Sequence, residues 1–187
     1  MNCNQYILEE INLQYSQLKE VVQCILHSIL FQRSLGTVKP RDMTLDCVEF
    51  SYVKADDPTS SKNIEDKSEE LLSSIIKRKA KTAQLSISFY EKRAKTNFFT
   101  TTTENVCWEQ WIISFRLVPT MDQKTLFSQL TDSVNKIIEN VNQDKNIPPI
   151  QASNQMPFPF SIQISGSENP GVADMVWNMF KPPQISK

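Results

Sequence analysis

Two alternating stretches of the sequence constrain the fold more than any other feature. Each places apolar side chains at every second position: Leu85, Ile87 and Phe89 in the first, and Trp111, Ile113, Phe115 and Leu117 in the second. Alternation of this kind, rich in aromatic and β-branched residues, is typical of strands that are buried on one face. We therefore expect two strands that follow one another in the sequence and form the centre of a sheet.

A polar connection of unusual length separates these two strands, roughly from Ala94 to Val106. Hairpin loops need only about 2–5 residues, and this one also carries two large apolar side chains, Phe98 and Phe99. Burying each in a partner would contribute roughly 1.5–3 kcal/mol, which is enough for an interaction hot spot. Phe98 and Phe99 are thus candidate partner-binding residues; the alternative is that they fold back onto the sheet.

Trp108 is out of phase with the second alternating stretch, since it is three residues before Trp111. Either a β-bulge near Glu109–Gln110 changes the register, or both faces of the strand are covered. In both cases the two tryptophans are expected to pack in the core and on the sheet rather than form a ligand cage.

Three helices are predicted from apolar residues spaced at helical intervals. The first spans Ser16 to Leu35 with Gly36 as a left-handed cap, the second runs from an N-cap within Thr59–Ser61 to about Lys79, and the third runs from a cap at Thr120 or Asp122 to about Val141. The first has a continuous apolar stripe: Leu18, Val21, Val22, Ile25, Leu26, Ile29 and Leu30.

Further strands are predicted at Leu45–Val53 and at Phe160–Ile164 because both alternate. Residues 5–13 suit either a short strand or the start of one long helix. Together the elements predict an α+β fold, in which three main helices pack on a mostly antiparallel sheet. A chain of 187 residues is most simply one domain, 1–187, in which 166–187 form an apolar tail that is docked or binds a partner.

Composition excludes several function classes. Three glycines cannot build a phosphate-binding or dinucleotide-binding loop, and four scattered cysteines with one histidine lack the spacing of a zinc site. We therefore expect no cofactor and no metal. The sequence shows no apolar run near 18 residues and no secretory signal, so we expect no membrane span and reduced thiols in the cytoplasm.

Two other functions have some support in the sequence. A thiol enzyme would use Cys24 and His27, although His27 is predicted to face solvent and no orienting group accompanies them. A nucleic-acid-binding protein would use the basic runs 77–81 and 92–95, but the net charge of -1 argues against it. The first of these runs is better explained as the basic C-terminal end of a helix.

Several stretches together resemble a known family. They are Met1-Asn2-Cys3, 25–30 with 33–36, 46–53, 85–90 followed by a basic cluster, Cys107-Trp108-Glu109-Gln110-Trp111, and Lys136-Ile137-Ile138. In order and spacing they are similar to the autophagy-related protein 101 family, whose members are HORMA domains. The resemblance implies that residues 5–13 contain a strand rather than a helix.

The resemblance also implies a function. It predicts a non-enzymatic scaffold of the autophagy-initiation kinase complex, located in the cytoplasm and at the preautophagosomal structure. The scaffold would pair with and stabilise the HORMA domain of autophagy-related protein 13, through the neighbourhood of 126–141, and recruit downstream autophagy factors. The alternative is a HORMA adaptor of the checkpoint or meiotic type, which captures a peptide.

The family's recruiting loop coincides with the 94–106 connection. Its typical members present an exposed Trp and Phe there, and Phe99 matches the Phe position whereas Asn97 occupies the Trp position. Whether the Phe98–Phe99 pair replaces that finger is left open by the sequence.

Overall fold

The computed structural model describes residues 3–34, 38–97, 100–143, 147–149 and 158–165, and the structural statements below concern these ranges. Gly36, Phe98, Phe99 and the tail 166–187, on which expectations were placed above, lie outside them.

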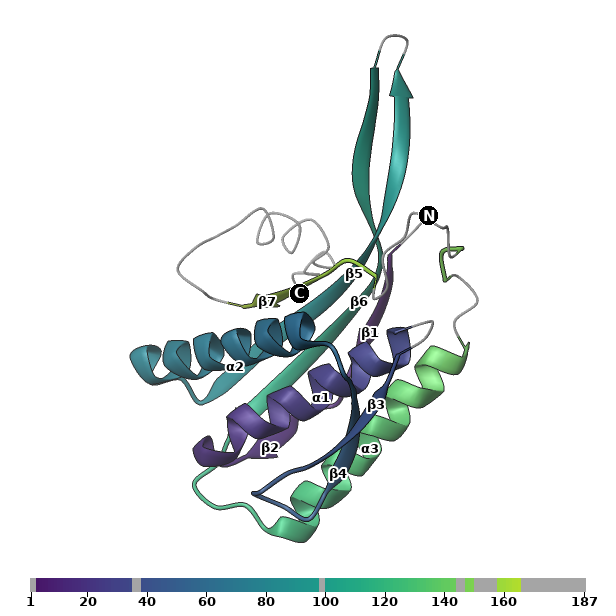
Figure 1. The fold of residues 1–187 in the computed structure, drawn as a ribbon. Coiled ribbons are helices and arrows are strands. Elements are labelled where there is room, and N and C mark those ends of the chain that lie inside the picture. The colour runs from purple at the N-terminus through teal and green to yellow at the C-terminus, as the bar shows by residue number, and fades with distance from the viewer. Residues whose placement is uncertain (1–2, 35–37, 98–99, 144–146, 150–157, 166–187) are drawn as a thin grey trace, which may run out of the picture.

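The described chain is an α+β fold, as predicted. Its elements are β1 (Asn4–Ile7), β2 (Ile11–Leu13), a 3₁₀ turn (Tyr15–Gln17), α1 (Leu18–Arg33), β3 (Pro40–Thr44), β4 (Ser51–Ala55), α2 (Pro58–Arg78), β5 (Thr82–Asn97), β6 (Thr100–Leu117), α3 (Gln123–Gln143) and β7 (Phe160–Ile164). The three helices lie side by side on one face of the main sheet (Figure 1).

The main sheet is organised around β6. Its strand order is β1-β6-β5-β7, and β2 also pairs with β6. The pairs β5–β6 and β5–β7 are antiparallel, whereas β1 and β2 run parallel to β6. The N-terminal segment is therefore two short strands, which confirms the strand alternative and excludes the long helix.

The alternating pattern of β5 and β6 separates an apolar face from a polar one. Leu85, Ile87, Phe89, Trp111 and Phe115 are all buried in the core with the helices. The other face carries side-chain hydrogen bonds between strands: Gln84 Nε2 donates to Ser114 Oγ (3.0 Å), Gln110 Nε2 to Ser88 Oγ (3.1 Å) and Gln5 Nε2 to Gln110 Oε1 (2.8 Å).

A second, two-stranded sheet gives the fold a third layer. The predicted strand Leu45–Val53 is only partly correct, because pairing begins at Ser51 and β4 pairs with β3, a strand that the sequence pattern did not indicate. Residues 45–50 form the turn between the two strands. Glu20 of α1 holds this turn by accepting hydrogen bonds from the backbone N–H groups of Asp46 (2.9 Å) and Cys47 (3.1 Å).

The capping residue of α2 differs from expectation, whereas α3 is capped by one of the two predicted residues. Asp57, rather than Thr59–Ser61, is the N-cap of α2, accepting from the N–H groups of Thr59 and Ser60 while Pro58 occupies the first turn. Asp122 caps α3 by accepting from the Thr125 N–H at 3.0 Å. Both positions follow the preferences of helix N-termini for acidic side chains and proline.

His27 is buried, so the prediction that it faces solvent is wrong. It points away from the main sheet, as expected from helical periodicity, but β4 packs on this outer side of α1. Its ring stacks on Tyr52 of β4 at 6.2 Å between centroids, and its exposed fraction is 7%. Burial, aided by the nearby charge of Lys54, lowers the His27 pKa to about 4.

The lowered pKa predicts a specific loss of stability in mild acid. Between the ordinary pKa of 6.5 and the folded value of about 4, the unfolded chain binds a proton that the folded chain does not. The stability linked to His27 is therefore complete above pH 6.5 and is lost as the pH falls towards 4, by about 3 kcal/mol in total. Urea unfolding at pH 7 and pH 4.5 measures this loss of stability.

His27→Gln is the matched variant, because it cannot titrate. Depressed carboxylate pKa values, such as those of Asp57 and Asp122, weaken both proteins equally in acid. The wild type should lose about 2–3 kcal/mol more than the variant between the two pH values. Equal losses would show that the His27 pKa is not lowered in the folded protein.

Candidate partner-binding surfaces

The β5–β6 hairpin extends well beyond the rest of the molecule (Figure 1). Its strands pair continuously to Asn97↔Thr100, so the expected long loop from Ala94 to Val106 is wrong. Only Phe98 and Phe99 separate the two strands in the sequence. Threonine is β-branched and favours strands, so the five threonines of this stretch, Thr96 and Thr100 to Thr103, account for the difference.

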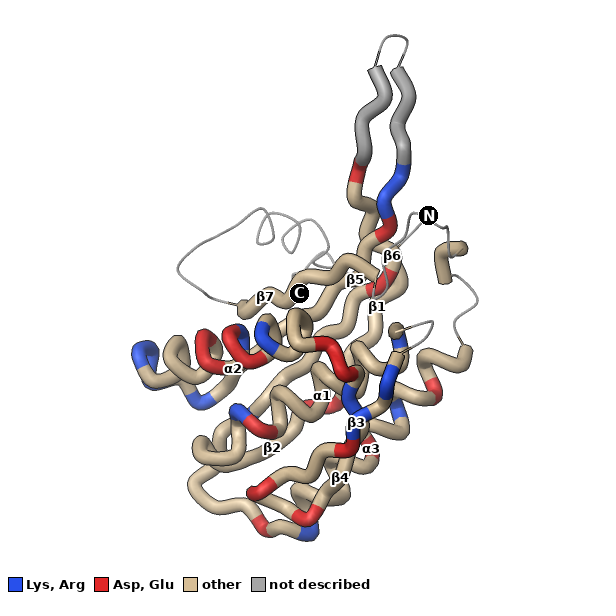
Figure 2. Tube along the Cα trace, viewed as in Figure 1, with Lys and Arg blue, Asp and Glu red and all other residues tan. Residues whose placement is uncertain are grey.

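Charged residues of both signs lie at the base of this hairpin (Figure 2). Arg93 of β5 forms an ion pair with Glu91 of its own strand and is aligned with Glu104 on β6. Opposite charges across a strand pair stabilise it modestly. Within the basic run 92–95, Arg93 therefore lies beside acidic residues.

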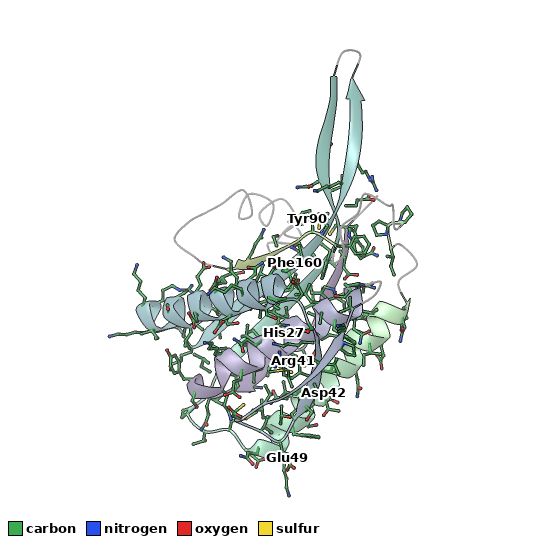
Figure 3. The ribbon with its side chains drawn as sticks, viewed as in Figure 1. His27, Arg41, Asp42, Glu49, Tyr90 and Phe160 are labelled. Carbon is green, nitrogen blue, oxygen red and sulfur yellow. The ribbon has the colours of Figure 1, made fainter. Side chains whose placement is uncertain are left out.

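A β-bulge marks the point at which the hairpin leaves the body. Phe89 pairs with Glu109 but Tyr90 pairs with Cys107, so Trp108 is the extra residue on β6. The bulge predicted near Glu109–Gln110 is therefore present, immediately before Glu109. Tyr90 and Phe160 lie together at this point (Figure 3); the Tyr90 N–H donates to Pro159 O at 2.8 Å and its hydroxyl is 3.1 Å from Ser161 Oγ.

The bulge buries both tryptophans, as predicted. Trp108 packs at 6.0 Å from Phe89 and 5.1 Å from Phe158 between ring centroids, and Trp111 packs at 4.5 Å from Tyr6. The two tryptophans have exposed fractions of 1% and 0%. They form the core beneath the hairpin, not a binding cage.

A buried ion pair joins α1 to β6 at the bulge. Arg33, the last residue of α1, donates from Nε to Glu109 Oε1 at 2.8 Å and from Nη2 to the second carboxylate oxygen. Trp111 Nε1 donates to Glu109 Oε1 at 2.6 Å, and the Arg33 guanidinium lies 5.4 Å from the centre of the Trp108 ring. Neither charged side chain has any solvent exposure.

A second surface is a groove between the β1–β2 connection and α3. Its volume is about 510 Å³, and residues 7–11 line one side. Four acidic side chains and one lysine line it: Glu9, Glu10, Asp132, Glu139 and Lys136. Gln129 joins the two walls, since its Oε1 accepts from the Asn12 N–H at 2.8 Å.

Apolar side chains are exposed around α3 and this groove. Among the described residues, five large apolar side chains are exposed: Ile7, Tyr15, Ile76, Phe127 and Ile138. Ile7 lines the groove, while Phe127 and Ile138 lie on α3 itself. The surface of α3 therefore combines apolar and acidic groups, which is a suitable composition for binding another protein.

The geometry gives no support to the two other functions considered. Cys24 and His27 are both buried; burial raises the Cys24 pKa to about 12 and lowers that of His27 to about 4, so the thiol is not activated. Lys77 and Arg78 form the basic last turn of α2, and Lys79 caps it in the left-handed conformation, the arrangement expected of a helix C-terminus.

Among the described residues, no three His, Cys, Asp or Glu side chains are grouped as metal ligands. No described helix is long and apolar enough to cross a membrane.

Comparison with known proteins identifies the family. Residues 10–154 match the family model described as Autophagy-related protein 101. The chain belongs to the autophagy-related protein 101 family. It is 32% identical to the Arabidopsis thaliana protein of that name over 195 aligned residues, which cover 90% of each chain. It is 26% identical to the Schizosaccharomyces pombe protein (82% of this chain, 83% of that one) and 23% identical to the Xenopus tropicalis protein (83% and 80%).

The match to the autophagy-related protein 101 family covers the hairpin and the α3 side of the groove, but not residues 7–9 of its other side. It includes the whole β5–β6 hairpin and all of α3, but not β7. The named relatives are autophagy-related proteins, and none of their names denotes an enzyme.

The buried ion pair at the hairpin base predicts an asymmetric response to mutation. Arg33→Met or Glu109→Gln should each lower the free energy of unfolding by about 3–5 kcal/mol, because the remaining charge is left buried without its partner. The double variant Arg33→Met/Glu109→Gln should lose less than the sum, since no charge remains and the Gln oxygen still accepts from Trp111. Urea denaturation measures all three.

The exposed pair Lys62–Asp66 on α2 is the control. Lys62→Met should leave the unfolding midpoint unchanged, because both side chains are largely in solvent. Arg33 and Glu109 would not be a mutually dependent buried pair if the losses of unfolding free energy were additive in the double variant. The same conclusion would follow if each single variant lost as little stability as the control.

Proposed function

We propose that this protein is a non-enzymatic HORMA-domain scaffold of the autophagy-initiation kinase complex, which pairs with the HORMA domain of autophagy-related protein 13. The observation that carries the proposal is the family match across the hairpin and α3. It is supported by the exposed apolar residues on α3, which a stable partner would cover. On this proposal the protein acts in the cytoplasm and at the preautophagosomal structure.

The proposed pairing surface is α3 with the groove beside it. Phe127 and Ile138 have exposed fractions of 45% and 38%, and Ile7, at the groove, 66%. Of these three, Ile7 lines the acidic groove, so a partner covering the groove would present apolar side chains together with lysine or arginine. Buried apolar contacts supply affinity at such interfaces, and the surrounding charges select the partner.

The proposed recruiting site is the tip of the β5–β6 hairpin. Because the last described pair is Asn97↔Thr100, Phe98 and Phe99 connect the ends of two long strands. Their position in the sequence favours presentation to downstream autophagy factors over packing on the body. The recruiting role of Phe98 and Phe99 rests on this connectivity and on the family resemblance.

Substitution on α3 tests the pairing. Ile138→Asp and Ile7→Asp should each weaken binding of autophagy-related protein 13 from the same organism at least about tenfold, because a charge would replace an apolar contact. Ile76→Asp is the matched control: Ile76 is equally an exposed isoleucine, 58% exposed, but lies on α2. Titration calorimetry with the purified HORMA domain of that partner gives the affinities.

If the wild type does not bind autophagy-related protein 13, the proposed pairing is wrong. If Ile76→Asp weakens binding as much as Ile138→Asp does, the interface does not lie on α3.

The double variant Phe98→Ala/Phe99→Ala tests the recruiting site separately. It should retain autophagy-related protein 13 in a pull-down from cells yet lose the downstream autophagy factors that the wild type recovers. Thr101→Ala/Thr102→Ala, on the neighbouring strand, controls for damage to the hairpin. Recovery of the same downstream factors by the phenylalanine variant would exclude the tip as the recruiting site.

A further inference from the structure

Two cysteines far apart in the sequence lie in direct contact at the base of the hairpin. Cys3 immediately precedes β1, and Cys107 belongs to β6, next to the bulged Trp108. Their Sγ atoms are 2.8 Å apart, and both side chains are partly exposed. The sequence spacing of the cysteines gave no indication of this pair, because 104 positions separate them.

Strand pairing produces the contact. β1 runs parallel to β6 with Asn4 opposite Glu109, so the residue before Asn4 lies beside the bulge. Neighbouring strands lie about 4.7–4.9 Å apart, and a disulfide requires roughly 4.4–6.8 Å between Cα atoms. The backbone spacing of adjacent strands therefore suits a disulfide without rearrangement of the fold.

We propose that Cys3 and Cys107 form an oxidisable dithiol, which closes to a disulfide by exchange with a low-molecular-weight disulfide of the glutathione type. The Cys107 thiolate attacks one sulfur of the small disulfide, forming a mixed disulfide and releasing one small thiolate. The Cys3 thiol then loses its proton and attacks Cys107 Sγ, releasing the second small thiolate. Two protein thiols are oxidised, and one small disulfide is reduced to two thiols.

The hydrogen-bonding of the pair assigns these roles. Contact with Cys3 lowers the pKa of the Cys107 thiol, and the same contact raises that of Cys3, so Cys107 ionises first and the Cys3 S–H then donates to its thiolate. A backbone hydrogen bond at Glu109 also lowers the pKa of Cys107. A thiol of lowered pKa is the one that attacks a disulfide first.

The other two cysteines differ from this pair. Cys24 is fully buried in α1, and Cys47 lies in the turn after β3. Burial raises the pKa of both thiols to about 12, so neither is expected to react at neutral pH. They serve as internal references for the chemistry.

Closing the disulfide would fix the N-terminus to the sheet. β1 is a strand of four residues at the edge of the main sheet, held on one side only by β6. A bond from Cys3 to β6 would tie this strand at the same point from which the hairpin extends. Oxidation is thus expected to stabilise the folded protein by constraining the unfolded chain, as a disulfide closing a long loop does.

The test equilibrates the purified full-length protein in buffers of increasing ratio of oxidised to reduced glutathione. Remaining thiols are then alkylated under denaturing conditions and mapped by mass spectrometry. The oxidised wild type should lose two of its four thiols and yield a Cys3–Cys107 linked peptide, with Cys24 and Cys47 alkylated. Its melting temperature should rise by about 5–10 °C, and dithiothreitol should reverse both changes.

Matched variants separate the pair from general thiol oxidation. Cys47→Ser should behave as the wild type, whereas Cys3→Ser should stop at a glutathione adduct on Cys107 and show no rise in melting temperature. Retention of all four thiols by the wild type in oxidised glutathione would overturn the proposal. So would a wild type that accumulates only glutathione adducts, or whose linked peptide joins other cysteines.

Discussion

The buried ion pair between Arg33 and Glu109 joins the end of α1 to the bulge of β6, and the rest of the structure depends on this connection. Two charges without solvent exposure can be tolerated only when each satisfies the other, so the end of α1 and the bulge of β6 cannot move independently. Glu109 also accepts from Trp111, and Arg33 lies over Trp108. The ion pair therefore fixes the register at which the body of β6 ends and the hairpin begins.

Helix α1 is enclosed between two sheets, and this explains both the success and the failure of sequence reasoning. Its inner stripe from Leu18 to Leu30 was evident from helical spacing, as were α2 and α3, and β7 and the two central strands were evident from their alternation. The outer side of α1 was not. His27 reads as a solvated residue unless one knows that β4 covers it, and that layer depends on a turn held by Glu20. A contact between residues 26 positions apart leaves no periodic signal in either segment.

The candidate surfaces were predictable to different degrees, for similar reasons. Phe98 and Phe99 stand out in the sequence because large apolar residues are rare between polar ones, yet the threonine-rich arms around them form strands where a loop was expected. The acidic groove was not foreseen, since it combines residues 7–11 with one side of α3. The Cys3–Cys107 contact was also not foreseen. It arises because β1 pairs in parallel with β6, and the two cysteines are 104 positions apart in the sequence.

On the proposed function the protein carries two binding surfaces, and β6 connects them. At one end β6 forms an arm of the hairpin; towards the other it pairs with β2, which Gln129 joins to α3. One continuous strand of 18 residues thus connects the hairpin tip to the α3 surface. Strand pairing on both sides stiffens β6 within the body, whereas beyond the bulge only β5 supports it. The Cys3–Cys107 pair lies at the bulge, where the body of β6 ends and the hairpin begins.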